Sequence, residues 1–273
     1  MHPDFISIGP LTIHVYGLMM ALGFVGGLAN WVWLGKRDGR SSQFCTDLMF
    51  WVMLSGILGS RLAYVLENWA SYAADPLTIF RIDQGGLIFY GGFVASVVAL
   101  VFFARRHRQP LAPLLDFVVT SVPLAHALGR IGCFFNGCCF GCWTQASVGV
   151  VFPRYSLPWH SQYLHKQIDA NALACLPVHP VQLYEAAFNF AVYGLLVVLF
   201  RRRLPAGCLA AIYLVLYGIG RFTLEFFRGD RGERLAVGSL SIGQFVSLLI
   251  IFAGCAVFAV LLGRRQKSGG PHA

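Results

Sequence analysis

The chain has 273 residues, of which 57% are hydrophobic and only 12% are charged. Soluble domains carry about 25% charged residues, so this composition excludes an ordinary soluble protein and indicates an integral membrane protein. The formal net charge of +9 does not indicate nucleic-acid binding, because the basic residues lie in short clusters between apolar segments.

Seven apolar segments are long enough to cross a bilayer as helices. In chain order they cover roughly residues 14–34, 46–66, 86–104, 115–135, 184–200, 207–226 and 243–262. The first segment has no basic flank before it and no small-residue cleavage site, so we expect a retained helix and not a signal peptide. The predicted fold class is an all-α membrane protein, a bundle of seven transmembrane helices that forms a single domain over residues 1–273.

The one long connection, residues 136–183, follows the fourth segment. It is rich in aromatic residues, proline and histidine. We expect it to form a small extracytoplasmic head between spans 4 and 5 that packs on the bundle.

The orientation follows from the basic residues of the connections, since cytoplasmic loops carry an excess of lysine and arginine. Four alternate connections each hold a basic cluster: Lys36, Arg37 and Arg40; Arg105, Arg106 and Arg108; Arg201, Arg202 and Arg203; Arg264, Arg265 and Lys267. The opposite side holds Arg81, Arg154, Lys166, Arg228, Arg231 and Arg234. The N-terminus is therefore predicted outside and the C-terminus in the cytoplasm.

Three arginines lie inside predicted spans: Arg61, Arg130 and Arg221. An arginine at the centre of a transmembrane helix costs about 2.5–3.5 kcal/mol on insertion scales. Each of these lies about 14–15 residues from the cytoplasmic end of its span, which is roughly 21–23 Å along a helix. One such arginine could snorkel to the interface, but three at one depth favour a shared anionic ligand. The planar guanidinium fork suits phosphate, so we expect a lipid phosphate of the outer leaflet or an anion that enters from outside.

Other polar residues fall near the same level. They are Tyr16, Tyr90, His179, Gln182, Tyr184, Glu185, Glu225 and Arg228. Simpler interpretations stay open for several of them. Interfacial tyrosines often only anchor a helix, Glu225 could form a structural ion pair with Arg221 one turn away, and the glycine pairs around Tyr90 could serve close helix packing.

Five motifs carry a resemblance to a known family. They are "HVYGLMM", "GGLIFYGG", "GRIGCFFNG", "HPVQLYE" and "YGIGRFTLEFFR". Their order and spacing resemble the prolipoprotein diacylglyceryl transferases over essentially the whole chain, and "GRIGCFFNG" is the most specific of them. The resemblance implies an enzyme of the bacterial cytoplasmic membrane that moves the diacylglyceryl unit of phosphatidylglycerol onto the cysteine thiol of a lipoprotein signal peptide and releases glycerol phosphate.

The resemblance also implies site residues. Arg130 matches the essential lipid-binding arginine of the family, and Arg221 matches its second essential arginine. With Tyr90 they form the predicted catalytic set. The predicted substrate-binding residues are Arg130, Arg61, Tyr16, Asn136, His179, Glu185, Glu225 and Arg228. Fixed guanidinium groups would stabilise the leaving phosphate, and we expect no metal and no other cofactor. The expected partners are phosphatidylglycerol, prolipoprotein signal peptides and the lipid bilayer.

Two features depart from the family pattern. Many members have histidine where this chain has Tyr90, whose unperturbed pKa near 10 makes it a poor resting base. The general base is therefore open between Tyr90 and His179, and Tyr90 could instead orient the glycerol. Cys133 and Cys138 replace the more common asparagine and glutamate, so Glu185 or Glu225 would have to supply the missing charge beside Arg130.

The chain has eight cysteines, and four of them crowd into residues 133–142. Cys139 and Cys142 form a Cys-x2-Cys pair, which can bind zinc or form a disulfide. An oxidising outer compartment favours a structural disulfide that involves two of these cysteines or Cys175, and free thiols remain an alternative.

Other functions would use the same residues differently. A membrane thiol oxidoreductase would use the outer cysteine cluster, and an anion or lipid-phosphate transporter would use the arginines along a path through both leaflets. A retinal-type receptor needs a lysine inside a span, whereas Lys36, Lys166 and Lys267 all lie in predicted loops.

Overall fold

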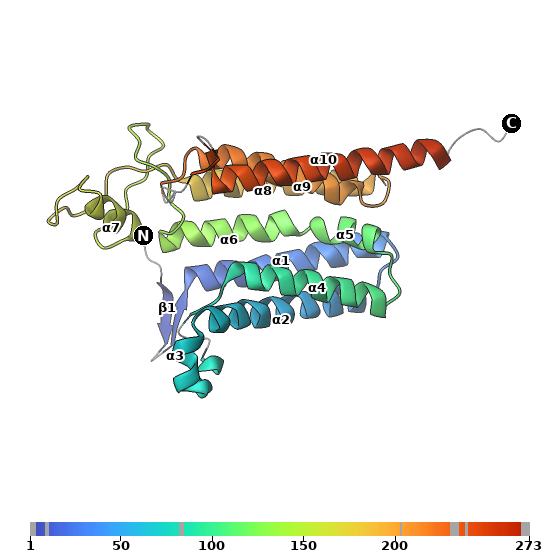
Figure 1. The fold of residues 1–273 in the computed structure, drawn as a ribbon, viewed down its shortest axis with the longest axis horizontal. Helices are drawn as coiled ribbons and strands as arrows, with labels where there is room; N and C mark the ends of the chain where they lie inside the picture. The colour runs from blue at the N-terminus through green and yellow to red at the C-terminus, as the bar shows by residue number, and fades with distance from the viewer. Residues whose placement is uncertain are drawn as a thin grey trace. The chain divides into compact units, whose positions relative to one another are not determined.

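The computed structural model describes residues 4–8, 11–81, 85–202, 204–229, 235–237 and 240–268. Seven helical segments of these residues are long and apolar enough to cross a membrane, which confirms the predicted spans (Figure 1). They are α1 (Val15–Arg37), α2 (Ser42–Glu67), α4 (Phe89–Arg106), the pair α5 and α6 (Leu111–Asn136), α8 (Val181–Arg201), α9 (Cys208–Glu225) and residues Ile242–Gly263 of α10 (Ile242–Ser268). Of the basic residues used for orientation, Arg203, Arg231 and Arg234 lie outside the described residues, as do the side chains of Arg264, Arg265 and Lys267.

The fourth span is not the continuous helix that the sequence predicted. It consists of α5 (Leu111–Val119) and α6 (Val122–Asn136), with a turn at residues 120–121. Pro123 stands in the first turn of α6. The N–H groups of a first turn have no partner within their own helix, so proline is tolerated there. Because proline has no N–H, it also cannot continue the hydrogen bonds of α5. The Ser121 hydroxyl donates to Gly27 O of α1 at 3.0 Å, so the interruption is tied to α1.

Short elements complete the fold. Two antiparallel ribbons add a little strand to the predicted all-α fold: β1 (Asp4–Ile8) pairs with β2 (Leu11–His14), and β3 (Leu235–Val237) with β4 (Leu240–Ser241). The remaining helices are α3 (Trp69–Ala74), the 3₁₀ turn η1 (Pro76–Phe80) and α7 (Leu157–Leu164).

The chain divides into two compact units. The first comprises Met1–Gly27 and Leu115–Ala273, and the second comprises Leu28–Leu114. In the second unit, α2 packs on α4 through glycines. A Cβ atom on Gly59 would lie 2.6 Å from Gly91 O, and one on Gly92 would lie 2.7 Å from Gly56 O. Close backbone approach of this kind is how membrane helices associate without a hydrophobic driving force, so Gly91 and Gly92 beside Tyr90 serve helix packing.

In the first unit, α6 packs on α8, α8 on α9, and α9 on α10. The start of α9 is fixed by the buried Asp116 of α5. One Asp116 carboxylate oxygen accepts from Gly207 N at 2.6 Å, and the other accepts from Ala210 N at 2.8 Å. A carboxylate at a helix N-terminus satisfies otherwise unpaired N–H groups and the helix dipole.

Residues 137–180 of the first unit have an apolar cluster of their own, formed by Phe140, Phe152, Trp159, Cys175 and Val178. Isolated backbone pairs, including Trp143 with Val178 and Pro153 with Ala174, tie the segment together.

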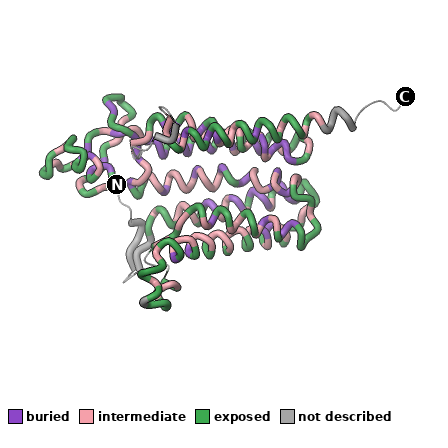
Figure 2. Tube along the Cα trace, in the orientation of Figure 1, coloured by how far each residue is buried: buried purple, intermediate pink, exposed green. Residues whose placement is uncertain are grey.

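Many residues along the long helices are exposed (Figure 2), and large apolar residues are numerous among them. Phe252 of α10 is 76% exposed, and Leu58 of α2 is 59% exposed. Such extended apolar exposure is not stable in water and is typical of surfaces that contact lipid. The protein is therefore a multi-pass membrane protein.

Candidate functional site

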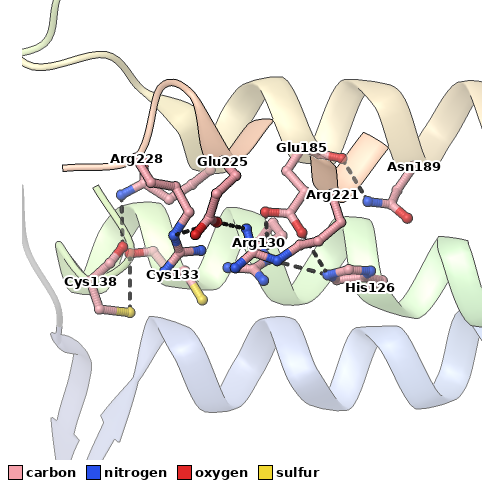
Figure 3. Close-up of polar contacts among 10 residues, drawn as sticks. His126, Arg130, Cys133, Cys138, Glu185, Asn189, Arg221, Glu225 and Arg228 are labelled. Carbon is pink, nitrogen blue, oxygen red and sulfur yellow. Dashed lines mark hydrogen bonds and ion pairs between the residues drawn. The ribbon is translucent and has the colours of Figure 1, made fainter. Parts of the chain in front are cut away.

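Two groups of charged side chains meet at one end of the first unit, where α6 and α9 end and α8 and α10 begin (Figure 3). The first group is centred on Glu185, in the first two turns of α8, whose side chain is only 5% exposed. Its Oε2 lies 3.1 Å from Arg130 Nε, and its Oε1 lies 3.1 Å from His126 Nε2. Of the two carboxylates that the sequence offered as partners for Arg130, Glu185 is the one that contacts it.

His126 is a member of this group that the sequence interpretation missed. It lies one helical turn before Arg130 on α6, and Arg130 Nε donates to His126 Nε2 at 3.2 Å. The same His126 nitrogen cannot accept from Arg130 and donate to Glu185 at once. With a proton on Nε2, His126 donates to Glu185. Without one, Nε2 accepts from Arg130.

The second group is centred on Glu225, at the end of α9, whose side chain is also buried. Arg221 Nη1 lies 2.5 Å from Glu225 Oε2, which confirms the predicted ion pair, and Arg228 Nε lies 3.9 Å from the same oxygen. The Ser241 hydroxyl donates to Glu225 Oε1 at 2.9 Å. A Cβ atom on Gly243 would lie 2.8 Å from this oxygen, so a larger residue where α10 begins would displace the Glu225 carboxylate.

Together the two groups contain three guanidinium groups and two carboxylates. With His126 neutral, the named side chains carry one excess positive charge. Arg130 and Arg221 are partly exposed, at 18% and 23% of their side chains. The arrangement can therefore bind an anion, and the guanidinium forks suit the oxygens of a phosphate.

Three cysteines lie beside these arginines, at the end of α6. The helix closes in a Schellman turn: Gly137 has a left-handed backbone with φ +73°, its N–H donates to Phe134 O at 3.2 Å, and Cys138 N donates to Cys133 O at 3.2 Å. This turn places Cys133, in the last turn of α6, against Cys138, the residue after Gly137. The sulfur atoms of Cys133, Cys138 and Cys139 all lie within 4.8 Å of one another. We call these three residues the thiol trio.

The outer cysteines do not behave as the sequence predicted. All eight cysteines are free thiols, so the expected disulfide is not formed. Cys142 is exposed and lies outside the thiol trio. The cysteines whose sulfurs lie close together are therefore not the two of the Cys-x2-Cys pair. Cys175 is buried in the apolar cluster of residues 137–180, where it accepts from Phe152 N at 3.1 Å and burial raises the pKa of its thiol.

Within the thiol trio, the pKa of Cys139 is lowered by its neighbours. Hydrogen bonds from the Cys133 and Cys138 thiols hold the pKa of the Cys139 thiol well below its ordinary value, and the positive charges of Arg130 and Arg228 act in the same direction. A thiolate is therefore favoured beside the arginines.

The remaining predicted residues of the first unit surround these groups. His179 Nδ1 lies 3.2 Å from the Tyr184 hydroxyl, and the His179 backbone pairs with Gly141 and Cys142. Tyr16 of α1 packs on Gly132 of α6, where an added Cβ atom would lie 3.1 Å from the tyrosine ring. The side chain of Asn136, the last residue of α6, forms a hydrogen bond with Cys138.

Arg61 belongs to the second unit, and its contacts differ from the expected ones. Its guanidinium has five N–H groups, and five backbone carbonyls accept from them at 2.8–3.2 Å. These are Ile79 O for Nε, Gly85 O and Gly86 O for Nη1, and Thr78 O and Arg81 O for Nη2. Arg61 therefore fixes the loop between η1 and α4. Lipid binding by Arg61 stays a prediction, and it would require this loop to release the side chain.

Tyr90 also belongs to the second unit. Its side chain is 77% exposed in the first turn of α4 and packs edge-on against Phe89. Among the residues whose side chains the structure describes, none forms a hydrogen bond with its hydroxyl. A substrate that reaches Tyr90 would therefore meet an accessible hydroxyl without a competing partner.

Comparison with known proteins agrees with this geometry. The family profile described as "Prolipoprotein diacylglyceryl transferase" matches residues 3–260. The phosphatidylglycerol–prolipoprotein diacylglyceryl transferase of Burkholderia cenocepacia (strain HI2424) is 35% identical over 98% of both chains. The protein of the same name from Pseudomonas fluorescens (strain SBW25) is 35% identical over 97% of this chain and 94% of its own. Phosphatidylglycerol–prolipoprotein diacylglyceryl transferase 2 of Clostridium perfringens (strain 13 / Type A) is 31% identical over 94% of both.

Proposed function

Because the chain belongs to the prolipoprotein diacylglyceryl transferase family and is a transferase of lipoprotein biosynthesis that uses phosphatidylglycerol, we propose that the basic groups of its first unit bind the phosphate of that lipid. The observation that carries the proposal is the pair of buried carboxylates, which hold three arginines together at one end of the unit. Arg130 and Arg221 would contact the phosphate directly. Glu185 and Glu225 would orient them, with Arg228 as a further contact.

The proposed reaction has one substitution step. The thiolate of the acceptor cysteine attacks the glycerol carbon that bears the phosphate ester. A carbon–sulfur bond forms, the carbon–oxygen bond breaks, and the electron pair leaves with glycerol phosphate. Charge grows on the phosphate as this bond breaks, so guanidinium groups fixed in place before the reaction stabilise the transition state more than the ground state.

The other predicted site residues take supporting roles in the proposal. Tyr16 and Asn136 would line the lipid headgroup beside α6, and His179 would contact the acceptor peptide or serve as a base. Tyr90, with its accessible hydroxyl, would orient the glycerol or take the thiol proton.

The acceptor and the location follow from the same proposal. We infer that the acceptor is the cysteine of a prolipoprotein signal peptide in the bacterial cytoplasmic membrane. The N-terminus and residues 136–183 would lie outside and the C-terminus in the cytoplasm, as the distribution of basic residues favours.

The test uses purified full-length protein, phosphatidylglycerol vesicles and a peptide with a lipobox cysteine. Mass spectrometry should find a thioether-linked diacylglyceryl group on the peptide and free glycerol phosphate. Arg130→Lys keeps the charge but loses the guanidinium fork, and it should lose nearly all turnover. Arg105→Lys, the same change at an exposed residue at the end of α4, is the matched control and should transfer normally. Normal turnover by Arg130→Lys would remove Arg130 from the site.

A further inference from the structure

We infer that the thiol trio, Cys133, Cys138 and Cys139, is a zinc site with an open fourth position that takes the sulfur of the acceptor cysteine. The inference rests on the proposed function, because it assigns a role in thiol alkylation. Zinc favours tetrahedral thiolate ligands, and catalytic zinc sites use three protein ligands and leave the fourth position to substrate. The sequence alone pointed to no metal in the reaction, and the convergence of the three sulfurs is the new observation.

The geometry fits the ion. Tetrahedral zinc with Zn–S bonds of about 2.3 Å requires sulfur–sulfur separations of about 3.8 Å. The three sulfurs already lie within 4.8 Å of one another. Each sulfur pair is therefore at most about 1 Å beyond the separation that the ion requires.

The backbone holds the three sulfurs together. The Schellman turn brings Cys138 over Cys133. Cys139 adopts a left-handed conformation with φ +57°, which residues other than glycine rarely adopt. Gln182, fully buried on α8, donates to Cys138 O at 2.8 Å and clamps the turn from the neighbouring helix. The trio is therefore positioned before any ligand binds.

The charges around the trio also suit the ion. Three thiolates and Zn²⁺ have a net charge of −1, which becomes −2 when an acceptor thiolate binds. Arg130 and Arg228 lie beside Cys133 and Cys138 (Figure 3), and they would compensate this charge. Asn136, the polar neighbour of Cys138, would satisfy a thiolate lone pair.

The site would replace a general base. Coordination by a metal ion deprotonates a thiol at neutral pH, and the proton leaves to solvent as the acceptor binds. The bound sulfur then attacks the glycerol carbon, and the electron pair of the broken carbon–oxygen bond leaves with glycerol phosphate. Zinc stays divalent, so no oxidant or reductant is needed. The thioether product carries no charge and is a weaker ligand than the thiolate, so it dissociates.

The first arm of the test measures metal binding without turnover. Reduced full-length protein in detergent is titrated with Co²⁺, which reports tetrahedral thiolate ligation by sulfur-to-metal charge-transfer absorption. We expect one ion per chain and displacement by Zn²⁺. Cys133→Ser, Cys138→Ser and Cys139→Ser should each weaken Co²⁺ binding at least tenfold and reduce the charge-transfer intensity. Cys142→Ser, which changes an exposed cysteine of the same loop, is the matched control and should bind like the wild type.

The second arm tests the open position. A lipobox peptide should shift the visible bands of the cobalt protein, and the same peptide with serine in place of its cysteine should not. Removal of metal by a chelator should reduce diacylglyceryl transfer at least a hundredfold, and Zn²⁺ should restore it.

Three results would overturn the inference. They are a reduced wild type with no charge-transfer band, a band that survives all three serine variants, and alkylation mapping that finds the trio bridged by a disulfide in protein isolated from the membrane. Full transferase activity after metal removal would overturn the catalytic role and leave the proposed function standing. Cobalt binding by a protein that never transfers a diacylglyceryl group would support the metal site and contradict the proposed function.

Discussion

Arg61→Lys is the change that best separates a structural arginine from a lipid-binding one. Wild-type Arg61 satisfies five backbone carbonyls of one loop with its five N–H groups. Lysine keeps the positive charge but has only three donors on one atom. At least two of the five carbonyls therefore lose their partner.

The expected loss follows from this count. A hydrogen bond that involves a charged group contributes about 1.5–3 kcal/mol, so two lost bonds correspond to about 3–6 kcal/mol. The loop is partly open to solvent, and water would return some of this energy, so we expect about 3 kcal/mol. Because 1.4 kcal/mol is a factor of ten in an equilibrium constant, the loop should open more than about a hundredfold more often.

Hydrogen–deuterium exchange measures this opening directly. Two amides report on the docked loop: Arg81 N donates to Thr78 O at 3.1 Å, and Ile88 N donates to Ser60 O of α2 at 3.1 Å. Peptides that cover them should exchange more than about a hundredfold faster in Arg61→Lys. Arg81→Lys, the same change at an exposed residue of the same loop, should leave exchange unchanged. Wild-type exchange in Arg61→Lys, combined with a raised KM for phosphatidylglycerol, would refute the structural role and favour a phosphate contact.

Three further changes test the site and its support. Arg221→Ala should lower kcat/KM about as severely as Arg130→Lys, at least a hundredfold in the vesicle assay, because each removes a fixed donor to the leaving phosphate; a loss in only one of them would show that a single arginine holds the phosphate. Tyr90→Phe should lower the initial rate no more than about tenfold at every pH tested, because it loses one ordinary hydrogen bond. A loss of about 10²–10⁴-fold would instead identify Tyr90 as a general base. That result would also count against thiol activation by zinc. Asp116→Ala should lower the stability of the purified protein by at least about 2 kcal/mol in chemical unfolding, because two N–H groups at the start of α9 lose their acceptor. Asp116→Asn, which keeps one acceptor oxygen, should lose about half as much. Equal stability of the wild type and both variants would show that water reaches the start of α9.

Hydropathy predicted the seven spans because a bilayer requires a minimum length of apolar helix. It could not predict the interruption at residues 120–121. There Pro123 acts through its missing N–H and not through its hydropathy, and the bond from Ser121 to α1 depends on a helix distant in sequence. The short ribbons near both ends of the chain also escaped prediction, since each has only two strands.

The candidate site was predicted in part. The motifs brought Arg130, Glu185, Arg221 and Glu225 into consideration, and the ion pair within α9 followed from its spacing of four residues. His126 was missed, although the same spacing separates it from Arg130. Depth in the membrane grouped Arg61 with the other arginines, but depth carries no information about which acceptors occupy a guanidinium.

The cysteines show how a familiar spacing can mislead. The Cys-x2-Cys pattern drew attention to Cys139 and Cys142, whereas the helix-terminating Gly137 was the informative residue. Its left-handed conformation folds the chain back on the last turn of α6, and this brings together cysteines that are five residues apart.

The bond between Asp116 and the start of α9 has a consequence for the opposite end of that helix. Arg221 lies fourteen residues after Gly207, so the anchor and the guanidinium are about 21 Å apart along the helix axis. A slide of α9 along its axis by even one residue would pull both amides away from the Asp116 carboxylate. Asp116 therefore acts as an axial stop. In the proposed site it would set the height at which Arg221 meets the lipid phosphate, although it lies far from any atom that reacts.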